Sequence, residues 1–184
     1  MSIERKGFNM MEKINETMIV DLNDLYLAQA KELVDRIFGY DDEDENPSQE
    51  LEASLSQELL YQYRDMVDDQ LRSFRYYVAV DGNQVKGIIG LYELEHDYKS
   101  NDWVGWFCVD NRFRGQQIGK KLLFHAINEA RIRGKQNLCL YTSTHENERE
   151  AQKLYEQNQF YVTRTVPRNG YDLLYRQKHL THND

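Results

Sequence analysis

Residues 103–123 read WVGWFCVDNRFRGQQIGKKLL. The first seven of these residues are nearly all apolar, as expected for a central strand of a sheet. A basic, glycine-containing loop follows over residues 110–117. From Ile118 onward, apolar residues recur at the spacing of one helical face, until Gly134 can end the helix. The stretch therefore predicts a strand, a basic loop and a helix N-terminus in direct succession.

The predicted helix start is suited to binding an anion. Its first turn presents N–H groups without intrahelical partners, together with the positive end of the helix dipole. Gly115 and Gly119 have no Cβ that would keep an anion away from the backbone. The basic side chains nearby are Arg112, Arg114, Lys120 and Lys121. The pattern favours a pyrophosphate site, and the alternative is a plain strand–helix turn with solvated basic residues.

Two familiar nucleotide-binding motifs do not fit this loop. The P-loop needs two glycines separated by four residues, then lysine and a hydroxyl residue. Here three residues separate Gly115 from Gly119, and Lys121 follows Lys120. The dinucleotide fingerprint needs three glycines within six positions, and only two are present. The sequence therefore supports neither nucleotide fold.

Further elements are predicted on both sides of this stretch. Strands are expected at residues 17–22, 75–80, 85–95, 137–142, 160–165 and 171–176. One helix should end at Gly39, a second should be capped by Ser48 and carry apolar positions as far as Leu71, and a third should span residues 148–158. Residues 81–83 read as a hairpin turn. This order predicts an α/β protein, with a mixed sheet and helices on both faces.

Length and composition fit one domain. With 184 residues, of which 40% are hydrophobic, the chain can bury a core and is not of a disordered type. No run approaches the ~20 apolar residues that span a bilayer, and the start lacks a secretory signal. Cys108 and Cys139 form neither a disulfide framework nor a zinc set. We expect one metal-free cytoplasmic domain over residues 1–184, with a tail at residues 1–16 and an acidic loop at residues 41–47.

Charge is distributed unevenly along the chain. The net charge is −8, but residues 1–75 hold 8 basic and 18 acidic side chains, whereas residues 112–135 hold seven basic and one acidic. Such asymmetry suggests two different partners, an anion at the basic band and a cationic acceptor at the acidic part. Charge that only faces water is the alternative. A nucleic-acid patch is a third interpretation, and the negative net charge disfavours it.

Two motifs resemble one known family. Residues 109–123 are similar to the acetyl-CoA-binding motif of the GNAT N-acetyltransferase superfamily, Gln/Arg-x-x-Gly-x-Gly/Ala, although Gln117 stands where glycine is usual. Residues 140–160 resemble the strand–helix signature of that family, which ends in Leu-Tyr-Glu-x-x-Gly-Phe. In this second motif Gln159 replaces the glycine, and Asn147 lies one residue early, with Glu148 in its usual place. The resemblance covers roughly residues 76–165.

The resemblance implies a fold and a cofactor. The GNAT acyltransferase fold has a central, mostly antiparallel mixed sheet of six to seven strands, with a splay between strands 4 and 5. Acetyl-CoA would donate its acetyl group directly to a primary amine of a small molecule or peptide, in a ternary complex. Its pyrophosphate would lie on the loop and helix start, and its pantetheine arm beside the preceding strand. The cofactor-binding residues implied are Phe107, Cys108, Val109, Arg114, Gly115, Gln116, Gln117, Ile118, Gly119, Lys120 and Asn147.

For the catalytic residues, the resemblance identifies a general acid, whereas the general base has only candidates. Tyr155 matches the frequent general acid of the family, which protonates the departing thiolate of CoA; its alternative role is packing. Glu93 is a candidate for the general base, and Glu95 a weaker one, because both lie near the end of the strand that pairs with residues 103–109. Each could instead be a solvated strand-edge carboxylate. A catalytically silent acyl-CoA-binding regulatory module on the same fold therefore stays open, as do the acceptor and the oligomeric state, for which a homodimer is one option.

Overall fold

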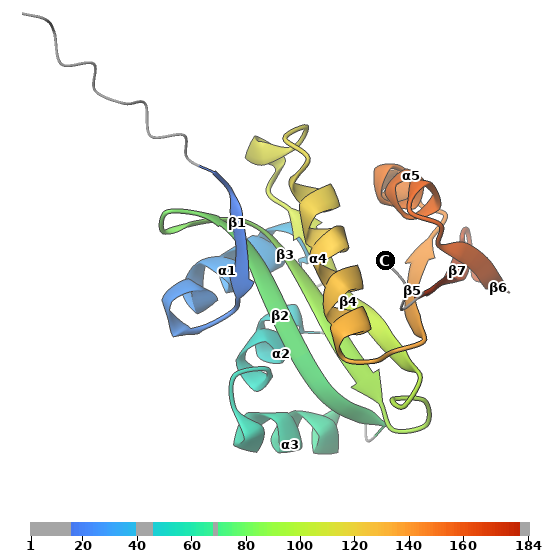
Figure 1. Cartoon of the computed structure of the whole chain (residues 1–184), viewed down its shortest axis with the longest axis horizontal. Helices are drawn as coiled ribbons and strands as arrows, with labels where there is room; N and C mark the ends of the chain where they lie inside the picture. Colours follow the sequence, from blue (N-terminus) through green and yellow to red (C-terminus); the bar gives the residue numbers. More distant parts are fainter. Residues whose placement is uncertain (1–15, 40–45, 68–69, 181–184) are drawn as a thin grey trace, which may run out of the picture.

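The computed structural model describes residues 16–39, 46–67 and 70–180. Seven strands form one sheet in the order β1-β2-β3-β4-β5-β7-β6, shown in Figure 1. Their bounds are Met18–Asp21 (β1), Leu71–Asp81 (β2), Gln84–Leu94 (β3), Asn101–Val109 (β4), Asn137–Ser143 (β5), Tyr161–Pro167 (β6) and Asp172–His179 (β7). Only β4 and β5 pair in parallel. The predicted class, a mixed and mostly antiparallel sheet of the GNAT type, is confirmed.

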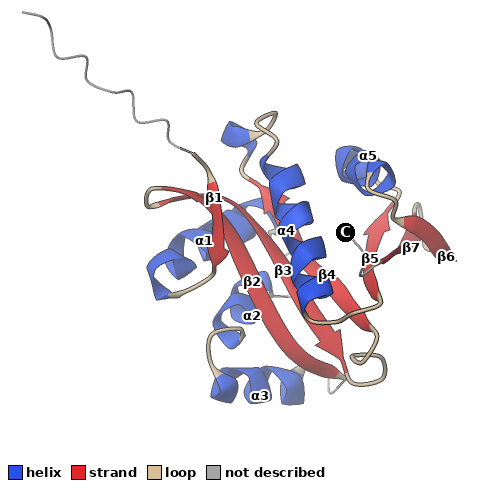
Figure 2. Cartoon of the chain, in the orientation of Figure 1, coloured by secondary structure: helices blue, strands red, loops and turns tan. Residues whose placement is uncertain are grey.

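Helices cover both faces of the sheet (Figure 2). Their bounds are Asp24–Phe38 (α1), Pro47–Ala53 (α2), Gln57–Met66 (α3), Ile118–Ile132 (α4) and Arg149–Gln157 (α5), with 3-10 turns at Asn111–Phe113 (η1) and Glu146–Glu148 (η2). One buried apolar cluster joins α4 and α5 to the sheet, and a second joins α1, α2 and α3 to its other face. No helix of the described residues is long and apolar enough to cross a membrane.

The helix predicted after Ser48 is wrong in its extent. Asn46 caps α2 and Pro47 opens it, so Pro47 belongs to a helix and not to the expected acidic loop. A separate cap, Ser56, begins α3, and Leu71 already belongs to β2. The apolar positions run on through the break, which is why periodicity alone joined the two helices. Residues 41–45 of the predicted loop and residues 1–15 of the predicted tail lie outside the described residues.

The parallel strands β4 and β5 diverge along their length. They pair only where Asn101–Trp103 lie beside Asn137–Cys139, and past these three pairs no described strand lies along this edge of β4. On the other edge, two residues of β4, Gly105 and Trp106, face the single residue Gly90 of β3. Such a bulge bends a strand. The predicted splay between strands 4 and 5 is therefore present.

A buried group of charges holds the paired end of β4 and β5. Arg133 contacts Asp102 at 3.0 Å and Glu93 at 2.7 Å, and Lys135 contacts Glu93 at 2.6 Å. Burial raises the pKa of Asp102, against the opposing charges of Arg133 and Lys135. Burial opposes the ionisation of Glu93 as well, but hydrogen bonds from Lys135 and Ser73 outweigh it and lower its pKa. We call Glu93, Asp102, Arg133 and Lys135 the closed-end cluster.

Candidate active site

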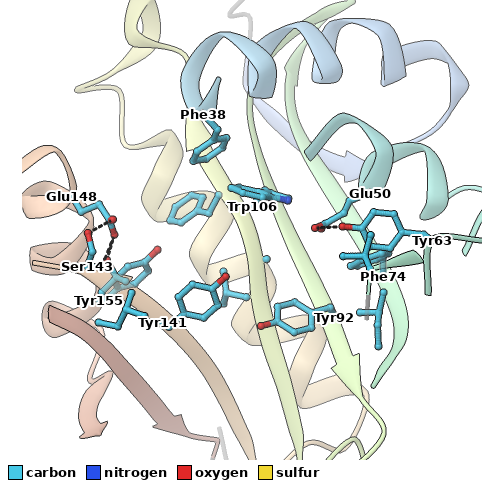
Figure 3. A pocket seen from close by; sticks show the side chains of 17 residues that line it. Phe38, Glu50, Tyr63, Phe74, Tyr92, Trp106, Tyr141, Ser143, Glu148 and Tyr155 are labelled. Carbon is cyan, nitrogen blue, oxygen red and sulfur yellow. Dashed lines mark hydrogen bonds between the residues drawn. The ribbon is translucent and has the colours of Figure 1, made fainter. Parts of the chain in front are cut away.

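A cavity of about 390 Å³ opens where β4 and β5 diverge (Figure 3). Helices α2 and α3 line one side of it, and β5 and α5 line the other. Eight of its 17 lining residues are aromatic: Phe38, Tyr63, Phe74, Tyr92, Trp106, Phe107, Tyr141 and Tyr155. The described lining holds two carboxylates, Glu50 and Glu148, and no lysine, arginine or histidine. The described lining of the cavity is therefore rich in aromatic side chains and has one carboxylate on each side.

Glu50 is held at the α2 wall by tyrosine hydroxyls. Tyr63 donates to one carboxylate oxygen at 3.0 Å, and Tyr76 donates to the other at 2.7 Å. Burial raises the pKa of Tyr76 well above its ordinary value, so its hydroxyl stays protonated and remains a donor. Gly90 makes room for this tyrosine, because a Cβ there would lie 2.4 Å from the Tyr76 ring. The carboxylate is thus positioned by buried partners from two other elements.

Tyr155 lies in the opposite wall, on α5. Its ring packs against Phe107 and Phe160, with ring centroids 6.3 and 5.8 Å away. Burial raises the pKa of Tyr155, the nearby Glu148 adds to the rise, and Arg176 opposes it. The hydroxyl therefore stays protonated at neutral pH, as a proton donor requires. The structure places this predicted acid in the cavity wall.

Glu148 ties the end of β5 to the start of α5. Its carboxylate accepts hydrogen bonds from the Thr142 and Ser143 hydroxyls and from the Ser143 N–H at 2.9 Å. The side chain of Gln152 donates to the Ser143 carbonyl. In the sequence Glu148 stood out only as the residue in the place of the usual asparagine. Asn147 itself is exposed in η2 and does not line the cavity.

The predicted cofactor residues follow β4 into the loop and the helix start. Phe107, Cys108 and Val109 pair with β3 on one edge, and no described strand pairs with them on the other. Gly115 and Gln117 both have left-handed backbones, with φ of 78° and 60°. No side chain caps α4, so the N–H groups of its first turn keep their capacity to bind an anion. Of the predicted cofactor residues, Ile118, Gly119 and Lys120 lie in this first turn, and Arg114, Gly115, Gln116 and Gln117 form the loop that leads into it.

The seven basic side chains of residues 112–135, the basic band, lie in different parts of the structure. Arg112 does not serve the helix start, because it pairs with Asp110 at 2.6 Å; its hydrogen bond lowers the pKa of Asp110 to about 2. Two other members belong to the closed-end cluster. Arg114, Lys120 and Lys121 have no ion pair within the part of the chain that the structure describes. These three cations therefore remain at the uncapped end of α4.

Neither predicted base lines the cavity. Glu93 belongs to the closed-end cluster, with its side chain only 13% exposed. Glu95 pairs with Arg72 at 3.0 Å and with Arg64 at 3.5 Å. Sequence reasoning missed Glu50, and no signal in the sequence could have separated it from the other carboxylates of residues 48–71. Its place depends on tyrosines 13 and 26 residues further along the chain.

Comparisons with known proteins agree with this architecture. Residues 72–162 match the family model for the acetyltransferase (GNAT) domain. A search of curated proteins found no match. Among solved structures, a GNAT-family acetyltransferase structure from Desulfovibrio desulfuricans is similar with a TM-score of 0.68 at 15% identity, and the match covers 90% of this chain and 100% of that one.

Two further solved structures have names that mention a substrate or a cofactor. The aminoglycoside 6′-N-acetyltransferase of Enterococcus faecium has a TM-score of 0.66 at 16% identity, over 89% of this chain and 97% of that one. The yncA acetyltransferase structure from Salmonella typhimurium, with its cofactor acetyl-CoA, has a TM-score of 0.67 at 17% identity, over 92% of this chain and 96% of that one. Such likeness shows the fold. The described residues contain no group of three or more side chains that could hold a metal ion.

Proposed function

This chain belongs to the GNAT acetyltransferase family, and from that premise we propose that it moves the acetyl group of acetyl-CoA directly to a primary amine. One observation carries the proposal. The cavity that contains Tyr155 and Glu50 lies at the splay, in line with an open strand edge and an uncapped, basic helix start. We take residues 1–184 as one cytoplasmic domain that forms a ternary complex with acetyl-CoA and a small-molecule or peptide amine.

The proposed cofactor path runs along β4. The pyrophosphate binds the N–H groups of residues 115–120, where Arg114, Lys120 and Lys121 add positive charge. The pantetheine arm lies beside Phe107–Val109 and uses the unpaired main-chain groups of that edge, as an added strand does. This path brings the thioester to the cavity. The Salmonella neighbour, whose cofactor is acetyl-CoA, supports the choice of donor.

Side chains on the two sides of the cavity, Glu50 and Tyr155, then transfer the protons. An ammonium has no lone pair, so the acceptor first gives a proton to Glu50, directly or through a water. The neutral nitrogen attacks the thioester carbonyl carbon, and the C–S bond breaks as the tetrahedral intermediate collapses. Tyr155 donates its hydroxyl proton to the departing thiolate, and the second proton that the attacking nitrogen loses on forming the amide returns to Tyr155 through water. Glu50 releases the first proton to solvent. We propose Glu50 in place of Glu93 and Glu95, because it lines the cavity and they do not.

A turnover assay tests the proposal. The purified protein is incubated with acetyl-CoA and a panel of primary amines, free thiol is followed, and products are identified by mass spectrometry. We expect thiol release that depends on the amine, with an equal amount of N-acetylated product. Binding of acetyl-CoA without turnover on any amine would favour a silent acyl-CoA-binding module. Absence of both binding and turnover would reject the proposed function.

A further inference from the structure

A buried acidic residue stands at the start of the loop to which we assign the pyrophosphate. Asp110 follows β4 directly, and its side chain is only 3% exposed. We propose that Asp110 and Arg36 are positioning residues for acetyl-CoA, because together they hold the loop of residues 111–117 in the conformation that binds the pyrophosphate. This inference rests on the proposed function and gives a role in cofactor binding to two residues outside the cofactor path.

Asp110 fixes the first turn of this loop through the main chain. One oxygen of its carboxylate accepts a hydrogen bond from the Arg112 N–H at 2.9 Å and so caps η1. The Asp110 N–H donates to the Lys86 carbonyl, and the Asp110 carbonyl accepts from the Phe113 N–H, both at 2.9 Å. The Arg112 side chain also reaches the carboxylate, but it is 64% exposed, and such exposed pairs contribute little. The turn therefore depends on Asp110.

Arg36 joins the same carboxylate to a distant helix. Its Nη2 lies 2.7 Å from Oδ2 of Asp110, while Oδ1 accepts the N–H that caps η1. Arg36 is in the last turn of α1, and α1 and α4 cover opposite faces of the sheet (Figure 2). The pair therefore fastens the start of the loop to a helix on the face opposite α4.

The middle of the loop is exposed, so its conformation depends on its two ends. Residues 114–117 are all exposed, and Gly115 and Gln117 have left-handed backbones. The buried Ile118 of α4 fixes one end of this segment, and Asp110 fixes the other. A loop that is held in its binding conformation loses less conformational entropy when a ligand binds. Anchoring by Asp110 should therefore raise the affinity for the cofactor.

The direction of the effect separates positioning from simple electrostatics. A carboxylate repels a nearby pyrophosphate, and this one also engages two arginines that would otherwise attract an anion. On charge alone, Asp110→Ala should therefore strengthen the binding of CoA. Positioning predicts the opposite, because the variant loses both the cap of η1 and the contact with Arg36.

Calorimetry with CoA tests the inference in the parent, Arg36→Gln, Asp110→Ala and the double variant. We expect the dissociation constant to rise about fivefold in Arg36→Gln and about tenfold in Asp110→Ala. The double variant should bind no more weakly than Asp110→Ala, because Arg36 acts through Asp110. Unchanged or tighter binding in Asp110→Ala would overturn the inference. Losses that add up in the double variant would also overturn it, since Arg36 would then contact the cofactor directly.

Arg36→Gln keeps the test independent of folding, because the Arg36 side chain is 46% exposed. Arg36→Lys keeps a charged donor and should restore binding to within about twofold of the parent. Steady-state rates should show a higher KM for acetyl-CoA in Arg36→Gln, with kcat within about twofold of the parent. An unchanged KM with a lowered kcat would contradict a role in cofactor binding.

Lys31→Gln is the matched control. Lys31 lies on the same helix, but it pairs with Glu52 of α2 and not with the loop. Its removal should leave the dissociation constant of CoA within about twofold of the parent. Equal weakening in Lys31→Gln and Arg36→Gln would reveal a general effect of α1 and overturn the inference alone. A parent protein that does not bind CoA would reject the proposed function, and the inference with it.

Discussion

The two ends of β4 are held in different ways, although they belong to one strand. At the paired end, Asn101–Trp103 lie beside β5, and the buried closed-end cluster joins β3, β4 and the segment after α4. At the other end, β3 is its one partner strand among the described residues, and the strand borders a cavity rich in aromatic side chains. The stretch of β4 that pairs with β5 and the stretch that lines the cavity are thus consecutive parts of one strand.

The comparison explains why the carboxylates Glu93 and Glu50 differ in role. Glu93 lies where Arg133 and Lys135 approach, and these cations leave it no access to the cavity. Glu50 lines the cavity instead, where it accepts hydrogen bonds from two tyrosine hydroxyls. The four predictions below test this division, beginning with the largest expected effect.

Removing a cation from the closed end should cost the most stability. Lys135→Met leaves Glu93 and Asp102 with one fewer buried counter-charge, and we expect a loss of about 3–5 kcal/mol in the free energy of unfolding. Urea denaturation measures the loss. Lys153→Met is the control, because Lys153 is exposed on α5, and its change should stay within about 0.5 kcal/mol. Similar losses in both variants would show that the closed-end cluster does not hold the fold.

Removing the proposed acid at the open end should affect catalysis and leave stability nearly unchanged. We expect Tyr155→Phe to lower kcat by about 100-fold, with little change in the KM for acetyl-CoA. Because burial raises the pKa of Tyr155, its loss of a proton should not limit the parent enzyme until the pH exceeds the ordinary tyrosine value of about 10. Steady-state rates across pH check both points. Unchanged turnover in Tyr155→Phe would remove this residue from catalysis.

Two arginines of the basic band should differ in their effect on cofactor binding. Arg114→Gln should raise the KM for acetyl-CoA by about tenfold, since a hydrogen bond to a charged group contributes ~1.5–3 kcal/mol. Arg112→Gln is the matched control, because Arg112 pairs with Asp110 and should not reach the phosphates. Initial rates at varied acetyl-CoA concentration measure both. A larger effect at Arg112 would contradict the division of the basic band.

The smallest expected effect concerns a strained backbone position. Gln159 has a φ of 64°, in the left-handed region that glycine adopts without cost. Gln159→Gly should therefore stabilise the protein by about 0.5–1 kcal/mol. Lys153→Gly, in the middle of α5, should destabilise it by a similar amount. Thermal unfolding of both variants measures the difference, and destabilisation by Gln159→Gly would contradict the strain.

Local patterns in the sequence predicted most of the elements, including the strand, loop and helix start where we propose that the cofactor binds. The turn at Gly82 and the helix from Ile118 follow from short-range patterns, whereas the splay was expected from the resemblance to the GNAT family. Both departures from the family motifs, Gln117 and Gln159, lie at left-handed positions, which explains why glycine is usual there. These features were predictable because each depends on neighbouring residues.

The acceptor side of the site could not be predicted in this way. The position of Glu50 depends on Tyr76, 26 residues away, and the engagement of Glu93 depends on Lys135, 42 residues away. The break between α2 and α3 was missed because Leu51, Leu55 and Leu59 continue an apolar pattern across it. Pairings of this kind depend on the folded sheet, and no local pattern records them.

The most direct measurement compares Glu50→Gln with Glu93→Gln in turnover and stability. We expect Glu50→Gln to lower kcat/KM by about 100-fold at neutral pH and to keep nearly the parent stability. Glu93→Gln should lower stability but keep kcat/KM within about threefold below its melting temperature. The reverse result, with turnover lost in folded Glu93→Gln and retained in Glu50→Gln, would contradict the account. In that account Glu93 stabilises the paired end of β4, and Glu50 acts in catalysis at the cavity.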